Sequence, residues 1–196
     1  VLKKSFNGSL NIHDAYLEMD FNGKADLSNS TPEFNFDDNI RKALLKNLNL
    51  TKEDFRVSGN VRTDFKGGKI DDVVGKIELN DVDVMRDSVE AHIKYLTLNA
   101  KLLSSEKKEI KLNSDFAEGE LEGNFTLKEL PKALISFAKY TFTKDYVDTA
   151  TTKTPQDFSA DLRIFEPGNL TQIIHPKFFL IRNSHIHGNF NSIDHQ

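Results

Sequence analysis

The chain has 196 residues, 26 basic and 30 acidic side chains, and a formal net charge of -4. These charges are well mixed and form no basic stripe, which argues against binding to a nucleic-acid backbone. The absence of cysteine excludes disulfides and thiolate metal sites, and no apolar run approaches the roughly 18 residues that a membrane-spanning helix needs.

Alternation of apolar and polar residues dominates the chain and predicts β-strands. The alternating segments, in chain order, are 6–12, 15–27, 34–40, 55–65, 73–79, 89–93, 96–102, 110–116, 118–127, 158–164 and 184–190. The third segment keeps its phase across Asp38, which stands where an apolar residue is expected. The fourth and fifth are joined by Lys66-Gly67-Gly68-Lys69, a sequence typical of a hairpin turn. We therefore expect about ten strands, mostly joined by short turns.

Glycine recurs on the apolar side of these segments. Six of the ten glycines lie in short runs that read residue, glycine, polar, apolar: Gly8, Gly23, Gly59, Gly75, Gly123 and Gly188. Glycine in a strand interior weakens the strand, so its repeated use needs a reason. One explanation is room for a neighbouring phenylalanine, or a bend in a twisted sheet. The other is a smooth patch in a groove through which a ligand slides.

Helical signals are sparse. Leu130, Leu134 and Phe137 recur at helical spacing and predict an amphipathic helix over about 129–142. The segment 170–174 predicts a single further turn. One helix of this length cannot cover the apolar side of ten strands, so the sheet must curl, pair with a second sheet, or leave a groove open. Alternation of strands with helices is missing, which argues against a parallel doubly wound fold.

Several stretches together resemble a known family. The run GELEGNFTLKELPKAL is followed by DFSADLRIFEPGNLTQIIHPKFFL and SHIHGNF. Earlier stretches, LEMDFNGKADLSNSTPEFNFDDNIRKALLKNLNL and VSGNVRTDF with IDDVVGKIELNDV, look like repeating units of the same family. The family is that of the TamB/AsmA-like envelope proteins, in the form found in Bacteroidetes-type bacteria. The resemblance spans nearly the whole chain and is most specific at Glu129-Leu130-Pro131.

The resemblance implies a fold and a function. Members of the family are long periplasmic proteins, anchored in the inner membrane, whose strands curl into an elongated, taco-like trough with an apolar interior. They take part in outer-membrane protein assembly and in carrying phospholipid between the membranes. We therefore expect residues 1–196 to form a single all-β, mainly antiparallel domain, a strongly curved trough or half-barrel. It would be an internal fragment of a longer protein whose anchor lies outside it.

The expected partners are phospholipid acyl chains or unfolded outer-membrane protein strands, with a β-barrel assembly protein of the outer membrane as partner of the full-length protein. Candidate groove-lining residues are those of the alternating apolar face: Leu17, Met19, Phe21, Phe34, Phe36, Phe55, Val57, Val61, Phe65, Ile77, Leu79, Leu121 and Phe125. Ordinary core packing explains each of them equally well, because alternation assigns a face but does not say whether that face is filled. The helix that contains Leu130, Leu134 and Phe137 would close one end of the trough, or act as a gate or membrane contact.

Residues that could carry chemistry are few. Three carboxylates share the polar face of one predicted strand: Glu118, Glu120 and Glu122. A solvated strand face explains them better than a catalytic pair in a cleft. A calcium loop counted from Asp81 fails, because Arg86 and His92 stand where glycine and glutamate are required. His185 and His187 share a strand face but lack further evident metal ligands. We expect no catalytic residue, no metal and no cofactor.

Two alternatives to a lipid-carrying groove remain open. One is a purely structural scaffold spanning the periplasm, whose interior is filled by its own side chains. The other is a carbohydrate-active β-sandwich enzyme, which requires two close carboxylates with perturbed pKa values in a cleft. The absence of tryptophan counts modestly against sugar binding.

Overall fold

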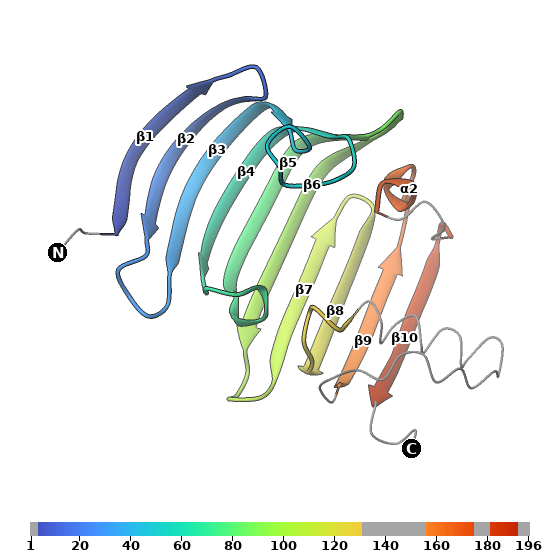
Figure 1. Cartoon of the computed structure of the whole chain (residues 1–196). Helices are drawn as coiled ribbons and strands as arrows, with labels where there is room; N and C mark the ends of the chain where they lie inside the picture. The colour runs from blue at the N-terminus through green and yellow to red at the C-terminus, as the bar shows by residue number, and fades with distance from the viewer. Residues whose placement is uncertain (1–3, 131–155, 175–180, 192–196) are drawn as a thin grey trace.

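The computed structural model describes residues 4–130, 156–174 and 181–191, and in these it contains one antiparallel sheet of ten strands (Figure 1). The strands are β1 (Ser5–His13), β2 (Leu17–Asp26), β3 (Glu33–Leu44), β4 (Phe55–Lys66), β5 (Val74–Arg86), β6 (Val89–Leu102), β7 (Lys108–Ser114), β8 (Ala117–Asn124), β9 (Asp157–Ile164) and β10 (Ser184–Asn191). Each strand pairs with the next along the chain. The predicted all-β, antiparallel fold is confirmed. The sheet is open, with β1 and β10 at its two edges.

Helical structure is confined to short pieces in the described residues. A 3-10 turn, η1 (Ile70–Asp72), lies in the connection between β4 and β5, so the predicted glycine hairpin is a longer loop. The predicted turn at 170–174 is confirmed as α2 (Leu170–Ile174), which lies against β5 and β6. Of the predicted helix 129–142, Leu130 is helical, while Leu134 and Phe137 lie outside the described residues. No helix in the described part is long and apolar enough to cross a membrane.

Strand β6 joins two segments that the sequence pattern separates. The alternation slips by one residue between Ile93 and Leu96, which looks like the end of one strand and the start of another. The neighbouring strand makes the same slip, because Val82 pairs with Ile93 and Leu79 pairs with Leu96. The two slips cancel across the pair, so both strands continue with their apolar residues on one face.

Glycine and phenylalanine face each other across neighbouring strands. Phenylalanine is the register partner of glycine in three pairs: Gly23 with Phe36, Gly75 with Phe65, and Gly123 with Phe158. A Cβ on Gly123 would lie 2.5 Å from Phe158 Cα, and one on Gly75 would lie 2.6 Å from Phe65 Cα. These positions therefore accept no side chain, because backbone atoms of the partner strand approach too closely.

Two packed clusters occupy parts of the apolar face. Under α2, the buried side chains of Val82, Ile93 and Leu170 pack together. Farther along the sheet, Phe125 and Phe158 form a second cluster, flanked by half-buried apolar residues of β7, β8 and β9. Most other residues of the apolar face are half-buried, with isolated buried positions such as Ala43 and Ile164, so the sheet has local cores rather than one continuous core.

Candidate functional site: the apolar face of the sheet

The alternating residues of β2 to β5 meet on one face of the sheet. Register places Val61 opposite Leu79, and Phe34 opposite Phe65, so residues far apart in sequence become neighbours. All of the candidate lining residues are half-buried except Phe125, which is 1 % exposed. Leu121 and Phe125 lie in and just after β8, on the same face but beyond β6 and β7. The face is therefore one surface with a packed end.

The sequence analysis missed the residues that link these two groups. Leu98 on β6 pairs with Ile77 on one side and Leu112 on the other, and Ile110 pairs with Leu121. The three missed residues, Leu98, Ile110 and Leu112, belong to alternating segments, so the signal was present in the sequence. Together they make the apolar face continuous from β2 to β8.

Aromatic rings form rows across the strands. The ring of Phe21 lies 5.6 Å from that of Phe6 and 5.4 Å from that of Phe36, measured between centroids. The rings of Phe34 and Phe65 stack at 4.9 Å. Phe55 differs, because the guanidinium of its register partner Arg86 lies 5.4 Å above its ring. At the β1 to β5 end, most aromatic rings thus contact other rings, and their side chains remain partly exposed to solvent.

Several polar side chains interrupt the apolar face in the described residues, and Ser114 and Lys108 are two that have partners. Ser114 Oγ donates to the carbonyl oxygen of Ala117 at 2.7 Å. Lys108 Nζ donates to the carbonyl oxygen of Asp71 at 3.0 Å and lies 5.2 Å from the centroid of the Phe125 ring. These two contacts anchor connecting segments to the sheet and explain why polar groups are tolerated there.

On the same face, Asp38 and Thr63 are not satisfied. Asp38 is 6 % exposed and Thr63 is 4 % exposed. Asp38 Oδ1 and Thr63 Oγ1 are buried without a hydrogen-bond partner in the described residues. Burial, and secondly the negative charge of Asp37, raise the pKa of Asp38 to about 6. Buried polar atoms normally find a partner, so these two need an explanation.

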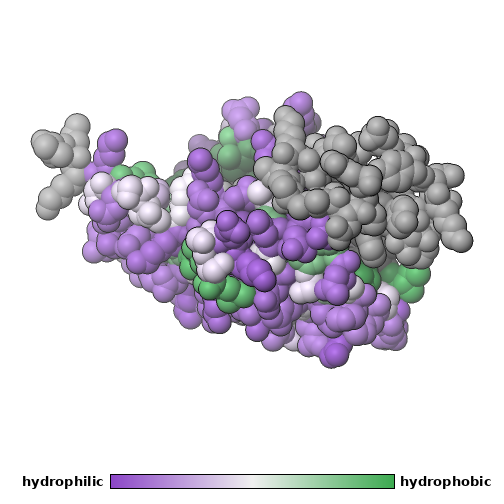
Figure 2. All heavy atoms as spheres, turned by 90° about the horizontal axis from the view of Figure 1, so that it is seen from below, coloured by the Kyte–Doolittle hydropathy of each residue, from purple (hydrophilic) through white to green (hydrophobic). Residues whose placement is uncertain are grey.

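Two hollows in the described residues are open and mainly polar rather than enclosed and apolar. A hollow of about 420 Å³ is lined mainly by polar side chains of β2 to β5, among them Asp37, Arg62 and Lys76. A second, of about 340 Å³, lies beside α2 between His92 and Asn169. From the side of the strand ends drawn in Figure 2, polar residues dominate and hydrophobic ones show as separate patches.

The opposite face carries ion pairs between neighbouring strands. Arg62 on β4 contacts Asp37 on β3 at 2.6 Å, and Lys66 contacts Glu33 at 2.9 Å. The hydrogen bond from Lys66 lowers the pKa of Glu33. The pairing with Lys66 favours the charged form of Glu33, which argues against its holding a proton for catalysis.

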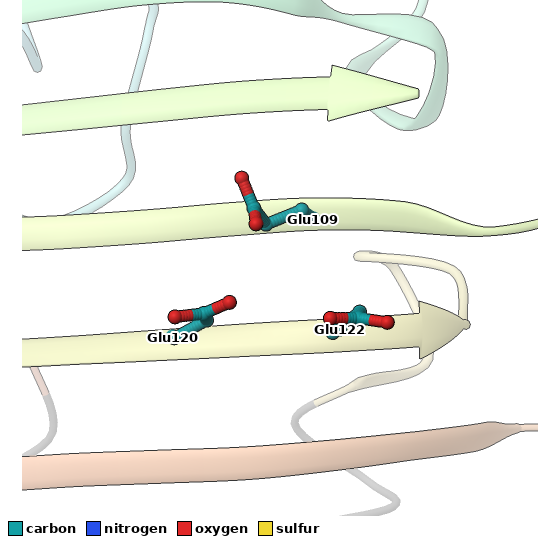
Figure 3. A group of neighbouring side chains, drawn as sticks. All are labelled: Glu109, Glu120 and Glu122. Atoms are coloured by element: carbon teal, nitrogen blue, oxygen red, sulfur yellow. The ribbon is translucent and has the colours of Figure 1, made fainter. Parts of the chain in front are cut away.

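Three glutamates of β7 and β8 lie close together. Glu109, Glu120 and Glu122 lie on two adjacent strands with carboxylate oxygens within 4.8 Å of one another (Figure 3). Lys111 contacts Glu109 at 3.1 Å and Glu120 at 3.5 Å, and its hydrogen bond lowers the pKa of Glu109. Because a lysine supplies the positive charge within this group, it is better described as an ion-pair network than as a metal centre.

Two predicted candidates for chemistry have partners of their own. Glu118 lies 3.1 Å from Arg163 on β9, apart from the other predicted glutamates. His185 and His187 on β10 both contact the Asp161 carboxylate, at 2.9 and 3.1 Å. The hydrogen bond from His185 lowers the pKa of Asp161. These contacts tie β9 to β8 and β10.

No protein-family model, curated protein or solved structure matches the chain. The functional argument therefore depends on the residues and their geometry.

Proposed function

We propose that this chain is a non-enzymatic segment that binds hydrocarbon chains on the apolar face of its sheet. The observation that carries the proposal is the continuity of that face, which runs over adjacent strands from β2 to β8 and stays half-buried along most of its length. A protein interior would bury these side chains fully, and an ordinary surface would not gather so many of them.

The finer shape that fits this function is a curved trough with the apolar face inside. Irregularities in pairing at Glu18/Met19, Ile40/Ala43 and Ser58/Asn60 support it, because bulges bend strands and increase their local twist. A curved sheet shelters its concave face without needing a second layer. The trough is the form that the resemblance to TamB/AsmA-like proteins implies.

Hydrophobic transfer supplies the driving force. Each methylene group that leaves water for an apolar surface contributes roughly 0.8 kcal/mol. Because neighbouring strands present similar apolar residues, a bound tail moves from one strand to the next without being exposed again. This mechanism needs no catalytic group, no metal and no cofactor.

The family resemblance supplies the setting. The chain would lie in the periplasm, within a longer protein anchored in the inner membrane, and serve lipid transport between the membranes or outer-membrane protein assembly. Phospholipid acyl chains need only the apolar face. An unfolded outer-membrane strand would in addition pair with the open edge at β1 or β10. A β-barrel of the outer membrane is the expected partner of the full-length protein.

A structural scaffold is the second candidate, and the two packed clusters favour it. Around Phe125 and Phe158, and under α2, the apolar face is filled by side chains of the chain itself. A scaffold filled in this way along its whole length would offer no surface to a ligand.

Crosslinking with a photoactivatable fatty acid tests the proposal. We expect adducts on peptides from β2 to β5, where the apolar face is half-buried, and few on the packed stretch around Phe125. Native mass spectrometry of the purified chain should show co-purified lipid. Adducts confined to the connecting loops, together with a lipid-free mass, would leave only the scaffold.

A further inference from the structure

Asp38 and Thr63 lie next to each other on the apolar face. Asp38 on β3 pairs with Phe21 on β2 and Val61 on β4. Thr63 stands two positions beyond Val61 on β4, so it is the diagonal neighbour of Asp38, with Cα atoms about 7–8 Å apart. The two oxygens that lack partners, Asp38 Oδ1 and Thr63 Oγ1, thus belong to one small region.

Hydrocarbon surrounds this pair. Along β3, the neighbours of Asp38 on the same face are Phe36 and Ile40, and Phe21 and Val61 stand across from it. Packing alone explains none of the polarity, because valine or leucine fits this environment without leaving a polar atom unpaired. The carboxylate and the hydroxyl become satisfied if a polar group of a ligand forms hydrogen bonds to both.

The ligand group must donate hydrogen bonds and carry a positive charge that complements ionised Asp38. Ionised Asp38 only accepts, and Thr63 Oγ1 accepts as well as donates. A primary ammonium has three N–H donors, and at normal hydrogen-bond lengths it bridges two oxygens about 5 Å apart. Charge-assisted bonds of this kind are strongest where water is excluded.

We propose that Asp38 and Thr63 bind the ammonium head of a primary-amine amphiphile, whose alkyl chain lies on the apolar face beside them. The inference rests on the proposed function, because the alkyl chain needs the open apolar face. It adds a ligand class, a long-chain primary amine, and a fixed position for the polar end. The half-buried rings of Phe21 and Phe36 flank Asp38 and would have to rotate to admit the ligand.

The electrostatics of the pair give the site a pH dependence. In the described residues, the same-face neighbours of Asp38 on β2 and β4 carry no ionisable group, and the charge that acts on it is Asp37, on the opposite face of β3. Because the pKa of Asp38 is raised to about 6, the empty site loses its negative charge as the pH falls through that value. An alkylammonium stays charged over this range, so binding weakens in acid.

Binding of decylammonium to the full chain tests the inference. The variants are Asp38→Asn and Thr63→Val, which keep size and remove charge or hydroxyl, and Asp64→Asn, an exposed carboxylate on the other face of β4, as the matched control. We expect Asp38→Asn to weaken binding at pH 7.5 about tenfold or more and Thr63→Val about threefold. Asp64→Asn should change it less than twofold. Wild-type affinity should fall between pH 7.5 and pH 5, and that of Asp38→Asn should not.

Decyltrimethylammonium and decanoate separate this inference from the proposed function. The first has the charge without N–H donors, and the second has the opposite charge. If the wild type binds all three probes and Asp38→Asn leaves decylammonium affinity unchanged, the apolar face binds hydrocarbon but the head-group site is refuted. If no probe binds, both proposals fail. Thermal unfolding of each variant checks that the fold is kept.

Discussion

The pairing of glycine with phenylalanine across strands is the most local rule in this sheet. At Gly123 the φ angle is +147°, and a Cβ would meet the carbonyl oxygen of Asp157 and Cα of Phe158. Gly188 lies on the edge strand β10 with nothing within 4 Å of the same position. Glycine is therefore required by close packing at position 123, whereas a side chain has room at position 188.

These two glycines give a matched pair of substitutions. We expect Gly123→Ala to lower the free energy of unfolding by about 2–3 kcal/mol, because backbone atoms of β9 must move. Gly188→Ala should leave it unchanged or raise it by up to about 1 kcal/mol, since alanine costs less backbone entropy. Urea unfolding measures both. Equal effects would contradict the role of close approach at Gly123.

Asp38 links a single buried carboxyl to the stability of the whole sheet. Its folded-state pKa of about 6 lies above the ordinary aspartate pKa of 3.8, so the folded protein binds a proton more tightly than the unfolded chain. Between these values, the free energy of unfolding contributed by Asp38 falls as the pH rises. The ionised form is the costly one, and this cost is complete above about pH 6.

Asp38→Asn should therefore stabilise the protein at neutral pH. We expect the free energy of unfolding of the variant to exceed that of the wild type by about 1–2 kcal/mol at pH 7.5. This range is reduced to allow for screening by nearby solvent. At pH 4 the difference should nearly vanish. Urea unfolding of both proteins at several pH values measures it. A difference that does not vary with pH would show that Asp38 keeps an ordinary pKa.

At the scale of elements, α2 holds down one end of the apolar face. Leu170 packs against Val82 and Ile93, and Arg86 donates to the carbonyl oxygen of Ile173 at 3.0 Å. Such a short helix has little stability of its own, so packing rather than propensity keeps it in place.

Leu170→Ala should weaken this attachment. We expect a loss of about 2 kcal/mol in the free energy of unfolding, from lost burial and the cavity left behind. Amide hydrogen exchange in β5 and β6 next to α2 should become faster. Gln172→Ala, on the exposed side of the same turn, serves as the control and should change neither quantity. Equal exchange in both variants would mean that α2 does not protect those strands.

The sequence predicted the strands well, but it predicted poorly how deeply their residues are buried. Alternation placed the strands and their faces, because the two-residue period is local to each strand. It divided β6 into 89–93 and 96–102, because a slip in phase looks like the end of a strand. The strand continues because β5 makes the same slip around Asp81, which the sequence of β6 alone does not show. It noted Asp38 in an apolar phase but not its burial, which depends on Phe21 and Val61 from other strands.

At the scale of the molecule, the open question is whether the apolar face carries hydrocarbon along its length. Val61 is a suitable position for the test, because it lies in the middle of the half-buried region, opposite Leu79 on β5 and Asp38 on β3. A charge there interrupts the face without replacing a buried member of either packed cluster. The Asp38 carboxylate can pair with an introduced guanidinium, which removes most of the cost of burying it.

Val61→Arg should thus fold and still bind less lipid. We expect several-fold fewer adducts with the photoactivatable fatty acid, because hydrocarbon loses favourable contact where a charge is held. Asn80→Arg places the same group on the exposed side of β5 and should leave the yield unchanged. Circular dichroism and thermal unfolding confirm that both variants are folded. Full crosslinking in folded Val61→Arg would mean that bound lipid does not lie over this part of β4, and a continuous path along the face would be refuted.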